Sequence, residues 1–374
     1  MRIGIEAQRL FRKSKHGMDF VALELIKNLP TDGEHEYFVF VNATDEECRI
    51  QNFPNVTIVN HTASYAVWEQ YWLPRQARKM DLDVLHCTAN TFPIFSRVPV
   101  VLTLHDVIFI ESNPLFSNGY TVYQRFGNMY RRLLLKYFNK SIRRVATVSR
   151  FEKLNIKIRL GSKLKTDVIY NGVSEHFNPD VVEHPSKEMV RKRYQLPWHY
   201  FLYLGNTDPK KNTPRTLRAF AEFVKDHPAA NLVVGDLKPS YIEKCLPGEK
   251  YAFARKRIHP VGYIENRHLP DLIKLSQGFL YPSLRESFGL PLLEAMACGV
   301  PVITADTSSM PEIAQDAAIK VNPKCEKTLT NAMNSLWSSD VWKNHFRELG
   351  IRRSAEFSWK RMSEQYVQLY ENVA

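Results

Sequence analysis

Residues 281–303 read YPSLRESFGLPLLEAMACGVPVI, which is a strand-like run, a short turn and a second apolar run. One acid, Glu286, precedes the turn, and another, Glu294, lies within the run that follows it. Pro291 suits the first helical position and Gly299 suits the C-cap. The stretch therefore predicts a strand, a turn and a helix, with a carboxylate on each side of the helix start.

The start of this helix is suited to an anionic ligand. The backbone N–H groups around Gly289 and Leu290 have no partner within the helix, and the helix dipole makes that end electropositive. Carboxylates accept hydrogen bonds from vicinal hydroxyls, each worth roughly 1.5–3 kcal/mol. The pattern predicts that Glu286 and Glu294 bind a sugar and a ribose attached to a phosphate. The spacing alone also allows Glu286 to be a surface acid and Glu294 an ordinary helix residue.

Apolar runs alternate with amphipathic ones on both sides of this stretch. In the first half, RIGIEA, YFVFVN, VTIVN, DVLHC, VVLTLHD and VATVS are typical of strands, and DFVALELIKNL is typical of a helix. The alternation restarts after about Pro197 with YFLYLGN, NLVVGD, IHPVGY, GFLYPS and PVITAD. Such alternation predicts parallel βαβ units with right-handed crossovers. We expect an α/β protein with two Rossmann-like, doubly wound domains whose strand ends face each other across a cleft.

A polar, proline-containing stretch before Pro197 separates the two series of runs. We expect a first domain over residues 1–185 and a second over residues 186–356. The last segment, FSWKRMSEQYVQLYENV, has an amphipathic helical pattern. We therefore expect residues 357–374 to form a helix that crosses back to the first domain.

The composition is that of a soluble globular protein. The chain has 374 residues, about the length of two domains, with 44% hydrophobic and 12% aromatic residues. It opens MRIGIEAQRL, which resembles a strand more than a signal peptide, and no apolar run approaches the roughly 18 residues that span a bilayer. The five cysteines are scattered without a CxxC pair, which argues against a zinc site or a disulfide framework. We expect a cytoplasmic protein without a bound metal.

The net charge of +12 is concentrated in one segment. Residues 125–165 contain thirteen Lys or Arg and one acid, Glu152. A field of this kind favours an anionic partner, which would be a membrane surface, a nucleic acid or a phosphorylated substrate. No recognised nucleic-acid-binding module accompanies the charge, so we do not expect a nucleic acid as partner.

Residues 120–142 have the pattern of an amphipathic helix within this basic region, which we take as residues 120–165. Its predicted apolar face consists of Tyr120, Tyr123, Phe126, Tyr130, Leu133 and Tyr137, and its cations are Arg131, Arg132, Lys136 and Lys140. Two interpretations stay open. The helix either faces the core with a solvated basic side, or it rests on an anionic membrane surface.

The stretch RESFGLPLLEAMACGVPVI resembles the Glu-x7-Glu motif of the family 4 glycosyltransferases, which have the two-lobed GT-B fold. Further landmarks follow in the family's order over nearly the whole chain, namely KHGMDFVALELIKNL, DVLH, TLHD, TVSRFEK, VIYNGV, YLGNTDPKKN, VGYI and FSW. The resemblance implies a retaining glycosyltransferase that uses a nucleotide-sugar donor.

The resemblance also implies roles for individual residues. His105 and Glu286 would be catalytic, with His105 touching the donor sugar near the reacting centre, and Lys211 would neutralise the donor diphosphate. The implied donor-binding residues are Gly17, Gly205, Lys211, Tyr263, Glu286, Phe288, Gly289, Leu290 and Glu294. Without the resemblance, His105 would be a buried histidine, Lys211 a solvated cation and Tyr263 a packing residue.

Two positions depart from the family pattern. His16 precedes Gly17 where many relatives carry a second glycine, and Asn206 follows Gly205 where many carry arginine. Lys210 or Arg215 could supply the missing charge. The family pattern requires no divalent ion, since a lysine and a helix N-terminus can hold the departing diphosphate.

The segments LHDVIFIESNPLFS and TVSRFEK most resemble mannosyltransferases that build bacterial surface polysaccharides. We therefore expect transfer of a hexose, mannose from GDP-mannose, to a glycan or lipid-linked acceptor at the inner face of the cytoplasmic membrane. A UDP-glucose, UDP-galactose or UDP-N-acetylglucosamine donor would leave the motifs intact. A phosphorylase would need a pyridoxal phosphate lysine, which is not identifiable in the sequence. A non-catalytic protein that binds nucleotide sugars is a further alternative.

Overall fold

The structure is a computed structural model that describes residues 1–8, 10, 17–31, 33, 35–42, 55–111, 122–180 and 187–374, with side chains of 122–124 excluded. It divides into two compact units. The first unit consists of Met1–Gly172 together with Trp359–Ala374, and the second consists of Val173–Ser358. Each unit is an α/β domain, as the alternation of apolar runs predicted.

The first unit is built on a parallel sheet whose described strands have the order β3-β2-β1-β4-β5-β6-β7. The strands are β1 (Arg2–Glu6), β2 (Glu36–Val41), β3 (Val56–Asn60), β4 (Val84–Cys87), β5 (Val100–Thr103), β6 (Ile142–Thr147) and β7 (Thr166–Val168). Strands β1, β4 and β5 are buried along nearly their whole length. Burial on both faces requires helices on both sides, which is the doubly wound arrangement.

The helices of the first unit follow the strands in the expected alternation. They are α1 (Gly17–Lys27), α2 (Tyr65–Val67), the π-helix η1 (Trp68–Trp72), α3 (Leu73–Lys79), α4 (Ile108–Glu111), α5 (Val122–Tyr137), the 3-10 helix η2 (Asn139–Ser141), α6 (Arg150–Leu160) and α16 (Trp359–Glu371). Buried side chains of β4, β5, α3 and α5 form one core cluster, which includes Leu85, Leu102, Ala77 and Leu135.

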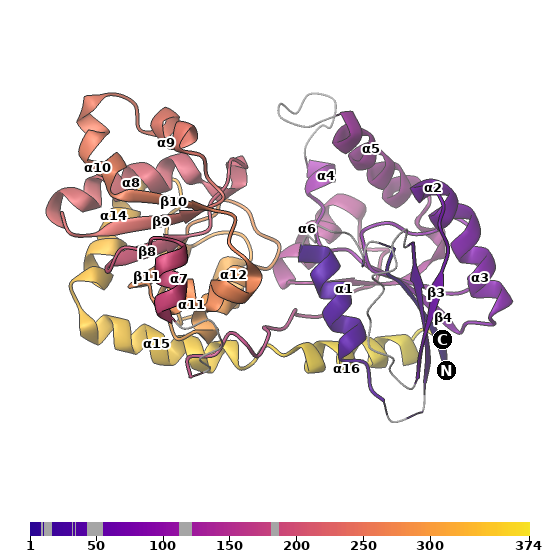
Figure 1. Cartoon of the computed structure of the whole chain (residues 1–374). Helices are drawn as coiled ribbons and strands as arrows, with labels where there is room; N and C mark the ends of the chain where they lie inside the picture. Colours follow the sequence, from indigo (N-terminus) through magenta and orange to yellow (C-terminus); the bar gives the residue numbers. More distant parts are fainter. Residues whose placement is uncertain are drawn as a thin grey trace. The chain divides into compact units, whose positions relative to one another are not determined.

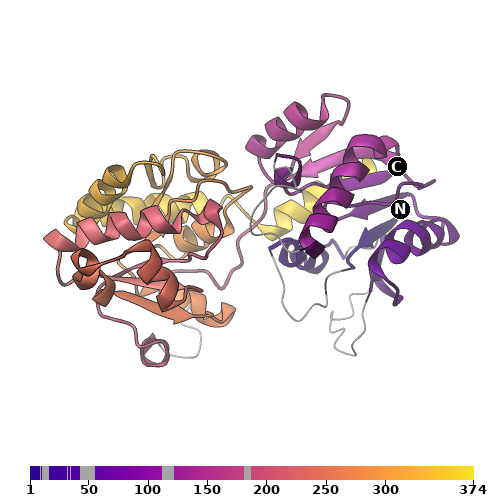
Figure 2. The ribbon, with the colours of Figure 1, turned by 90° about the horizontal axis from the view of Figure 1, so that it is seen from above.

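The terminal helix α16 packs on the first unit, which confirms the expectation drawn from its amphipathic pattern. Figure 1 shows α16 beside α1, and Trp359 meets Phe20 of α1 edge to face at 5.8 Å. His86 of β4 lies within hydrogen-bonding distance of Tyr370, at 2.7 Å, and of the Thr103 hydroxyl, also at 2.7 Å. Burial lowers the pKa of His86 to about 3, so this residue is a neutral part of the core. Both chain ends therefore lie on the same unit, as Figure 2 shows.

Along the chain, the boundary between the two units lies between Gly172 and Val173, whereas the sequence pattern placed it between residues 185 and 186. The reason is that the chain joins the second unit soon after β7. The backbone N–H of Val173 donates to the carbonyl of Phe357 at 3.2 Å. The polar composition that suggested a linker therefore begins after the chain has already changed units.

The second unit contains another parallel sheet, whose described strands have the order β10-β9-β8-β11-β12-β13. The strands are β8 (Tyr200–Tyr203), β9 (Asn231–Gly235), β10 (Ile258–Gly262), β11 (Gly278–Tyr281), β12 (Val302–Ala305) and β13 (Ile319–Val321). The helices are α7 (Lys187–Arg193), η3 (Pro209–Lys211), α8 (Thr213–Asp226), α9 (Pro239–Cys245), η4 (Glu249–Tyr251), α10 (Ala252–Lys256), η5 (Asn266–His268), α11 (Leu269–Lys274), α12 (Leu290–Ala297), α13 (Met310–Ala314), α14 (Glu326–Trp337) and α15 (Asp340–Ser354).

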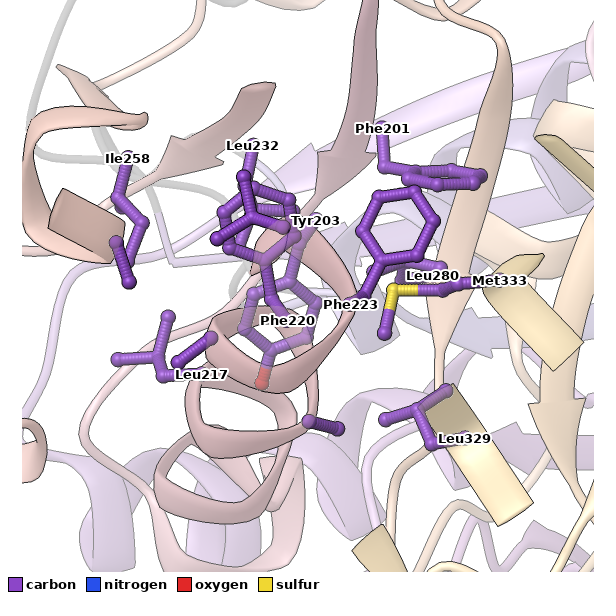
Figure 3. Close-up of a cluster of buried hydrophobic side chains, with 14 of the residues drawn as sticks. Phe201, Tyr203, Leu217, Phe220, Phe223, Leu232, Ile258, Leu280, Leu329 and Met333 are labelled. Atoms are coloured by element: carbon purple, nitrogen blue, oxygen red, sulfur yellow. The ribbon is translucent and has the colours of Figure 1, made fainter. Parts of the chain in front are cut away.

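Helices α8 and α14 cover one face of this sheet with a continuous apolar cluster. Figure 3 shows Phe220 and Phe223 of α8, Leu329 and Met333 of α14, and Phe201 of β8 in this cluster. Phe201 and Phe223 meet edge to face with ring centroids 5.6 Å apart, a favoured aromatic geometry. The cluster packs strand β8 against helix α8, and the segment between these two elements, which includes η3, carries Lys211.

None of the helices within the described ranges combines the length and the apolar character needed to cross a bilayer.

Candidate functional site

The candidate site lies where the strand order of the second sheet reverses. The chain moves outward from β8 through β9 to β10, and then returns to place β11 against the other side of β8. Loops at the carboxyl ends of two such strands diverge and leave room for a ligand. Lys211 lies in the loop after β8, and Glu286 lies in the loop after β11.

Lys211 and Glu286 form an ion pair at this point. The ammonium Nζ of Lys211 donates to Oε1 of Glu286 at 2.8 Å, and the two side chains are only 16% and 13% exposed. The Lys211 ammonium also lies 5.0 Å from the ring centroid of Tyr281, the last residue of β11. Burial, reinforced by the Glu286 carboxylate, raises the pKa of the Tyr281 hydroxyl well above its ordinary value. The pair is well placed to exchange its internal bond for bonds to a ligand, with Lys211 taking an anion and Glu286 taking hydroxyl donors.

Buried hydrogen bonds fix the loop that carries Lys211. The Tyr203 hydroxyl donates to the carbonyl of Lys211 at 2.8 Å. Asn212 has a left-handed φ of 63°, and its buried amide donates to the carbonyls of Pro282 and Pro323 at 3.0 and 2.6 Å. These bonds connect the loop after β8 to the loops after β11 and β13. Gly205 is required here, because an added Cβ would lie 2.1 Å from the Tyr203 ring.

Two serines after β12 hold the turn that carries Glu286. The Ser308 hydroxyl donates to the carbonyl of Glu286 at 2.5 Å and accepts from its N–H at 2.9 Å. The Ser309 hydroxyl lies 3.0 Å from the carbonyls of both Glu286 and Phe288. Ser308 has φ +64°, an uncommon conformation for a residue with a side chain. The turn is therefore held by residues that sequence reasoning did not identify.

Helix α12 begins at Leu290 with Gly289 as its N-cap. Gly289 has φ +103°, which favours glycine, and no side-chain cap bonds the first turn in the described structure. The electropositive end of the helix is thus available to a ligand. Phe288 is buried and meets Phe357 edge to face at 5.9 Å, so its side chain anchors the turn instead of facing a ligand.

Glu294 lies one turn into α12, and its carboxylate has no hydrogen-bond partner within the described parts of the chain. Burial raises the pKa of this carboxyl to about 7. A half-buried acid without a partner is costly to keep charged, so it gains from a ligand that donates hydrogen bonds to it. The second sheet therefore brings Lys211, Glu286, the start of α12 and Glu294 around Tyr281.

His105 belongs to the first unit, two residues after the end of β5. Its side chain is buried, its backbone N–H donates to Asn90 at 2.7 Å, and its Nε2 lies 3.0 Å from the carbonyl of Thr88. A carbonyl can only accept, so Nε2 carries the proton and Nδ1 is left as an acceptor. Burial lowers the pKa of His105, which keeps the imidazole neutral. His105 is therefore buried, as the interpretation without the resemblance stated, and a backbone carbonyl bonds one of its two nitrogens.

The other expected positions have different surroundings. Gly17 begins α1, and nothing in the described surroundings would contact a side chain there. His16 lies outside the described residues. Tyr263 follows the edge strand β10 and is 80% exposed, two strands away from β8.

Lys210 and Arg215, the two candidates to supply the charge of the missing arginine, both have partners. Lys210 pairs with Asp208 at 3.6 Å, and Arg215 donates to the side chain of Asn212 at 3.2 Å. The Asn206 carbonyl accepts from Thr213. Lys211 is therefore the cation that pairs with the acid of the motif.

The sequence matches two families of glycosyltransferases. Residues 191–372 match glycosyl transferases group 1, and residues 16–177 match Glycosyltransferase Family 4.

Curated relatives include two O-antigen chain mannosyltransferases. O-antigen chain mannosyltransferase B of Escherichia coli is 29% identical over 184 residues, which cover 49% of this chain and 48% of that protein. O-antigen chain mannosyltransferase RfbU of Salmonella typhimurium is 28% identical over 272 residues, which cover 71% of this chain and 69% of that protein. The chain spans about half the length of the first relative, and about a quarter of the serotype-specific mannosyltransferase WbdA of Escherichia coli, at 24% of its length.

Solved structures share the fold over their whole length. HepE of Anabaena in complex with UDP and glucose has a TM-score of 0.73 at 17% identity, and the match covers 100% of both chains. Sucrose-phosphate synthase of Thermosynechococcus elongatus has a TM-score of 0.72 at 18% identity, covering 99% of this chain and 98% of the other. The two parallel sheets thus have the GT-B fold that the resemblance implied. The chain belongs to the family 4 glycosyltransferases.

Proposed function

We propose that the protein is a retaining hexosyltransferase whose second unit binds a nucleotide-sugar donor. The observation that carries the proposal is the ion pair of Lys211 and Glu286 at the start of α12, where the second sheet reverses its strand order. Family membership supports the same assignment.

Each residue of the pair gains a new partner when the donor binds. The donor pyrophosphate accepts from the Lys211 ammonium and from the N–H groups at Gly289 and Leu290. The carboxylate of Glu286 is then released to accept hydrogen bonds from hydroxyls of the sugar. Glu294 accepts from the ribose hydroxyls. The site stabilises the charge that develops on the departing diphosphate and thus acts mainly through electrostatics.

His105 completes the proposal from the first unit. Its neutral imidazole presents Nδ1 as an acceptor for a donor-sugar hydroxyl, while Thr88 holds the other nitrogen. We assign the acceptor substrate to the first unit. We further propose that the reaction uses no divalent cation, because Lys211 and the helix end supply positive charge to the leaving group.

The donor we propose is GDP-mannose. The support is the set of mannosyltransferases among the relatives. HepE has a solved complex with UDP-glucose, so a UDP-hexose is the second candidate donor. The exposed Tyr263, two strands from β8, is our candidate for contact with the base.

The acceptor we propose is a glycan or a lipid-linked glycan of surface polysaccharide synthesis, reached from the cytoplasmic face of the membrane. The support on this chain is helix α5. Its side chains Phe126, Leu133 and Tyr137 are 66%, 45% and 68% exposed, which disfavours a core-facing role for this side of the helix. Tyr130 instead contributes to a buried network with Glu69, and Tyr120 lies outside the described residues. Exposed apolar side chains among cations suit the surface of an anionic bilayer.

The test is release of nucleoside diphosphate when the protein is mixed with each donor and a lipid extract that contains acceptors. We expect GDP release from GDP-mannose that depends on the extract, and we expect Glu286→Gln and His105→Ala each to abolish it. Full activity in both variants would refute the assignment of the site. Donor binding without any release, for every donor and acceptor, would instead indicate the non-catalytic alternative.

A further inference from the structure

A second candidate site lies in the first unit, at the amino ends of the strands, whereas His105 lies at their carboxyl ends. A hollow of about 630 Å³ is lined by Arg75, Arg78, Arg97 and Lys140, together with Phe95 and Gln70. Arg97 precedes β5 and Lys140 precedes β6, so the hollow lies at the amino ends of these strands. His105 follows the carboxyl end of β5. The hollow is therefore separate from the chemistry proposed above.

The hollow is strongly positive. Its four cations make no ion pair with a carboxylate in the part of the chain that the structure describes. Arg75 donates to the carbonyl of Tyr71 at 3.1 Å, and its guanidinium lies 3.2 Å from the centre of the Tyr71 ring. Four cations around one hollow raise each other's energy, and an anion in the hollow removes that repulsion.

The loop that borders the hollow is held in place, although it exposes a large apolar side chain. The Ile94 N–H donates to the Gln70 side chain at 2.8 Å, and the Ser141 hydroxyl donates to the carbonyl of Pro93 at 3.2 Å. Phe95, between these anchors and Arg97, is 85% exposed. An exposed aromatic ring beside cations, on an anchored loop, is typical of a surface that meets the headgroup region of a bilayer.

Further exposed aromatic rings lie close by in the chain. Tyr71, under Arg75, is 57% exposed, and Tyr137 and Phe138, just before Lys140, are 68% and 42% exposed. A soluble phosphate compound would use the cations but would have no use for these rings. A phospholipid uses both, since its phosphate binds cations while the rings enter the interface.

We propose that this hollow binds the phosphate headgroup of an anionic phospholipid. The inference goes beyond glycosyl transfer and rests on the membrane association proposed for α5. It assigns to Arg75, Arg78, Arg97 and Lys140 a headgroup site that α5 alone does not provide.

The test compares vesicle binding by the full chain and by two double variants. Arg78→Ala with Arg97→Ala removes two cations from the hollow. The matched control, Arg347→Ala with Arg352→Ala, removes two exposed arginines from α15 in the second unit. Binding is measured by cosedimentation with phosphatidylcholine vesicles that contain or lack phosphatidylglycerol, and thermal unfolding checks that each variant is folded.

We expect the wild type and the control to bind vesicles containing phosphatidylglycerol. Each cation near an anionic surface contributes roughly fivefold to binding, so the hollow variant should bind roughly 30-fold more weakly. Unchanged binding by the hollow variant would overturn the proposal, as would an equal loss in the control. Equal wild-type binding to phosphatidylcholine alone would also overturn it.

A second arm distinguishes a lipid from a soluble phosphate. Inorganic phosphate and glycerol phosphate are titrated into the wild type and the hollow variant without vesicles. If the hollow variant no longer binds these phosphate compounds but binds vesicles as the wild type does, the hollow is a site for a soluble phosphate and the lipid is rejected. GDP and UDP affinity is measured in parallel. If the wild type binds neither GDP nor UDP, the proposed donor site is refuted, whereas the proposed headgroup site is unaffected.

Discussion

Glu294 should make donor binding dependent on pH. Its carboxyl has a pKa of about 7 because it is buried without a hydrogen-bond partner among the described residues. The protonated acid carries a donor on one oxygen and is a weaker acceptor than the carboxylate, so it binds the ribose hydroxyls less well. Donor binding should therefore release a proton below about pH 7.

The magnitude follows from the pKa in the free and bound protein. If the ribose restores an ordinary carboxyl pKa, affinity for the donor rises about 30-fold from about pH 5.5 to about pH 8. The same shift affects stability in the opposite direction. A raised carboxyl pKa means that its stabilisation is complete at low pH and is lost as pH rises towards about 7. At pH 8 the buried charge costs the second unit about 3 kcal/mol.

Glu294→Gln separates these effects from other titrations. Calorimetry with a nucleotide sugar is the appropriate assay, because its doubly esterified diphosphate does not titrate in this range. The variant should bind the donor with little dependence on pH, and it should unfold at a higher temperature than the wild type at pH 8. An identical pH dependence in both proteins would refute the role given to Glu294.

Three further predictions concern the bonds around the sites. Lys211→Ala should weaken binding of nucleoside diphosphate by about 2 kcal/mol, roughly 30-fold. Lys210→Ala should leave the affinity measured by calorimetry unchanged, because the Lys210 ammonium faces Asp208. Equal losses of affinity in the two variants would contradict the assignment. Ser308→Gly keeps the backbone conformation but removes the hydrogen bonds to the turn, so it should slow transfer about tenfold with nucleotide affinity nearly unchanged. Transfer by this variant at the wild-type rate would show that the turn needs no such support. His86→Phe should lower the free energy of unfolding of the first unit by about 1–3 kcal/mol in denaturant titrations, since the buried Tyr370 hydroxyl loses its partner while the Thr103 hydroxyl keeps only its bond to Tyr366. An unchanged midpoint would contradict this.

Local signals were sufficient to predict the strand, turn and helix around residues 281–303. Gly289, Pro291 and Gly299 each occupy a position that their backbone preferences favour, and β11, α12 and β12 follow as expected. Pro291 is the second helical residue instead of the first, and Gly299, with φ +68°, directly follows the C-cap Cys298. Strands β7 and β13 were missed because three residues are too few to show a period.

The hydrogen bonds that hold the site in place could not be predicted from the sequence, because they depend on tertiary contacts. Ser308 reaches the turn only through the pairing of β11 with β12, and its hydroxyl bonds a residue 22 positions away. Asn212 bonds carbonyls 70 and 111 positions away. Neither spacing leaves a pattern in the chain. The side of α5 that faces water was also undecided, since an amphipathic pattern shows that two faces differ but not what covers each.

A crystal structure with GDP or UDP bound would test the central claim most directly. We predict that the pyrophosphate lies at the N–H groups of Gly289 and Leu290, that Lys211 has left Glu286 to bind it, and that the ribose hydroxyls reach Glu294. A nucleotide bound elsewhere, with the 2.8 Å bond between Lys211 and Glu286 still in place, would contradict the account.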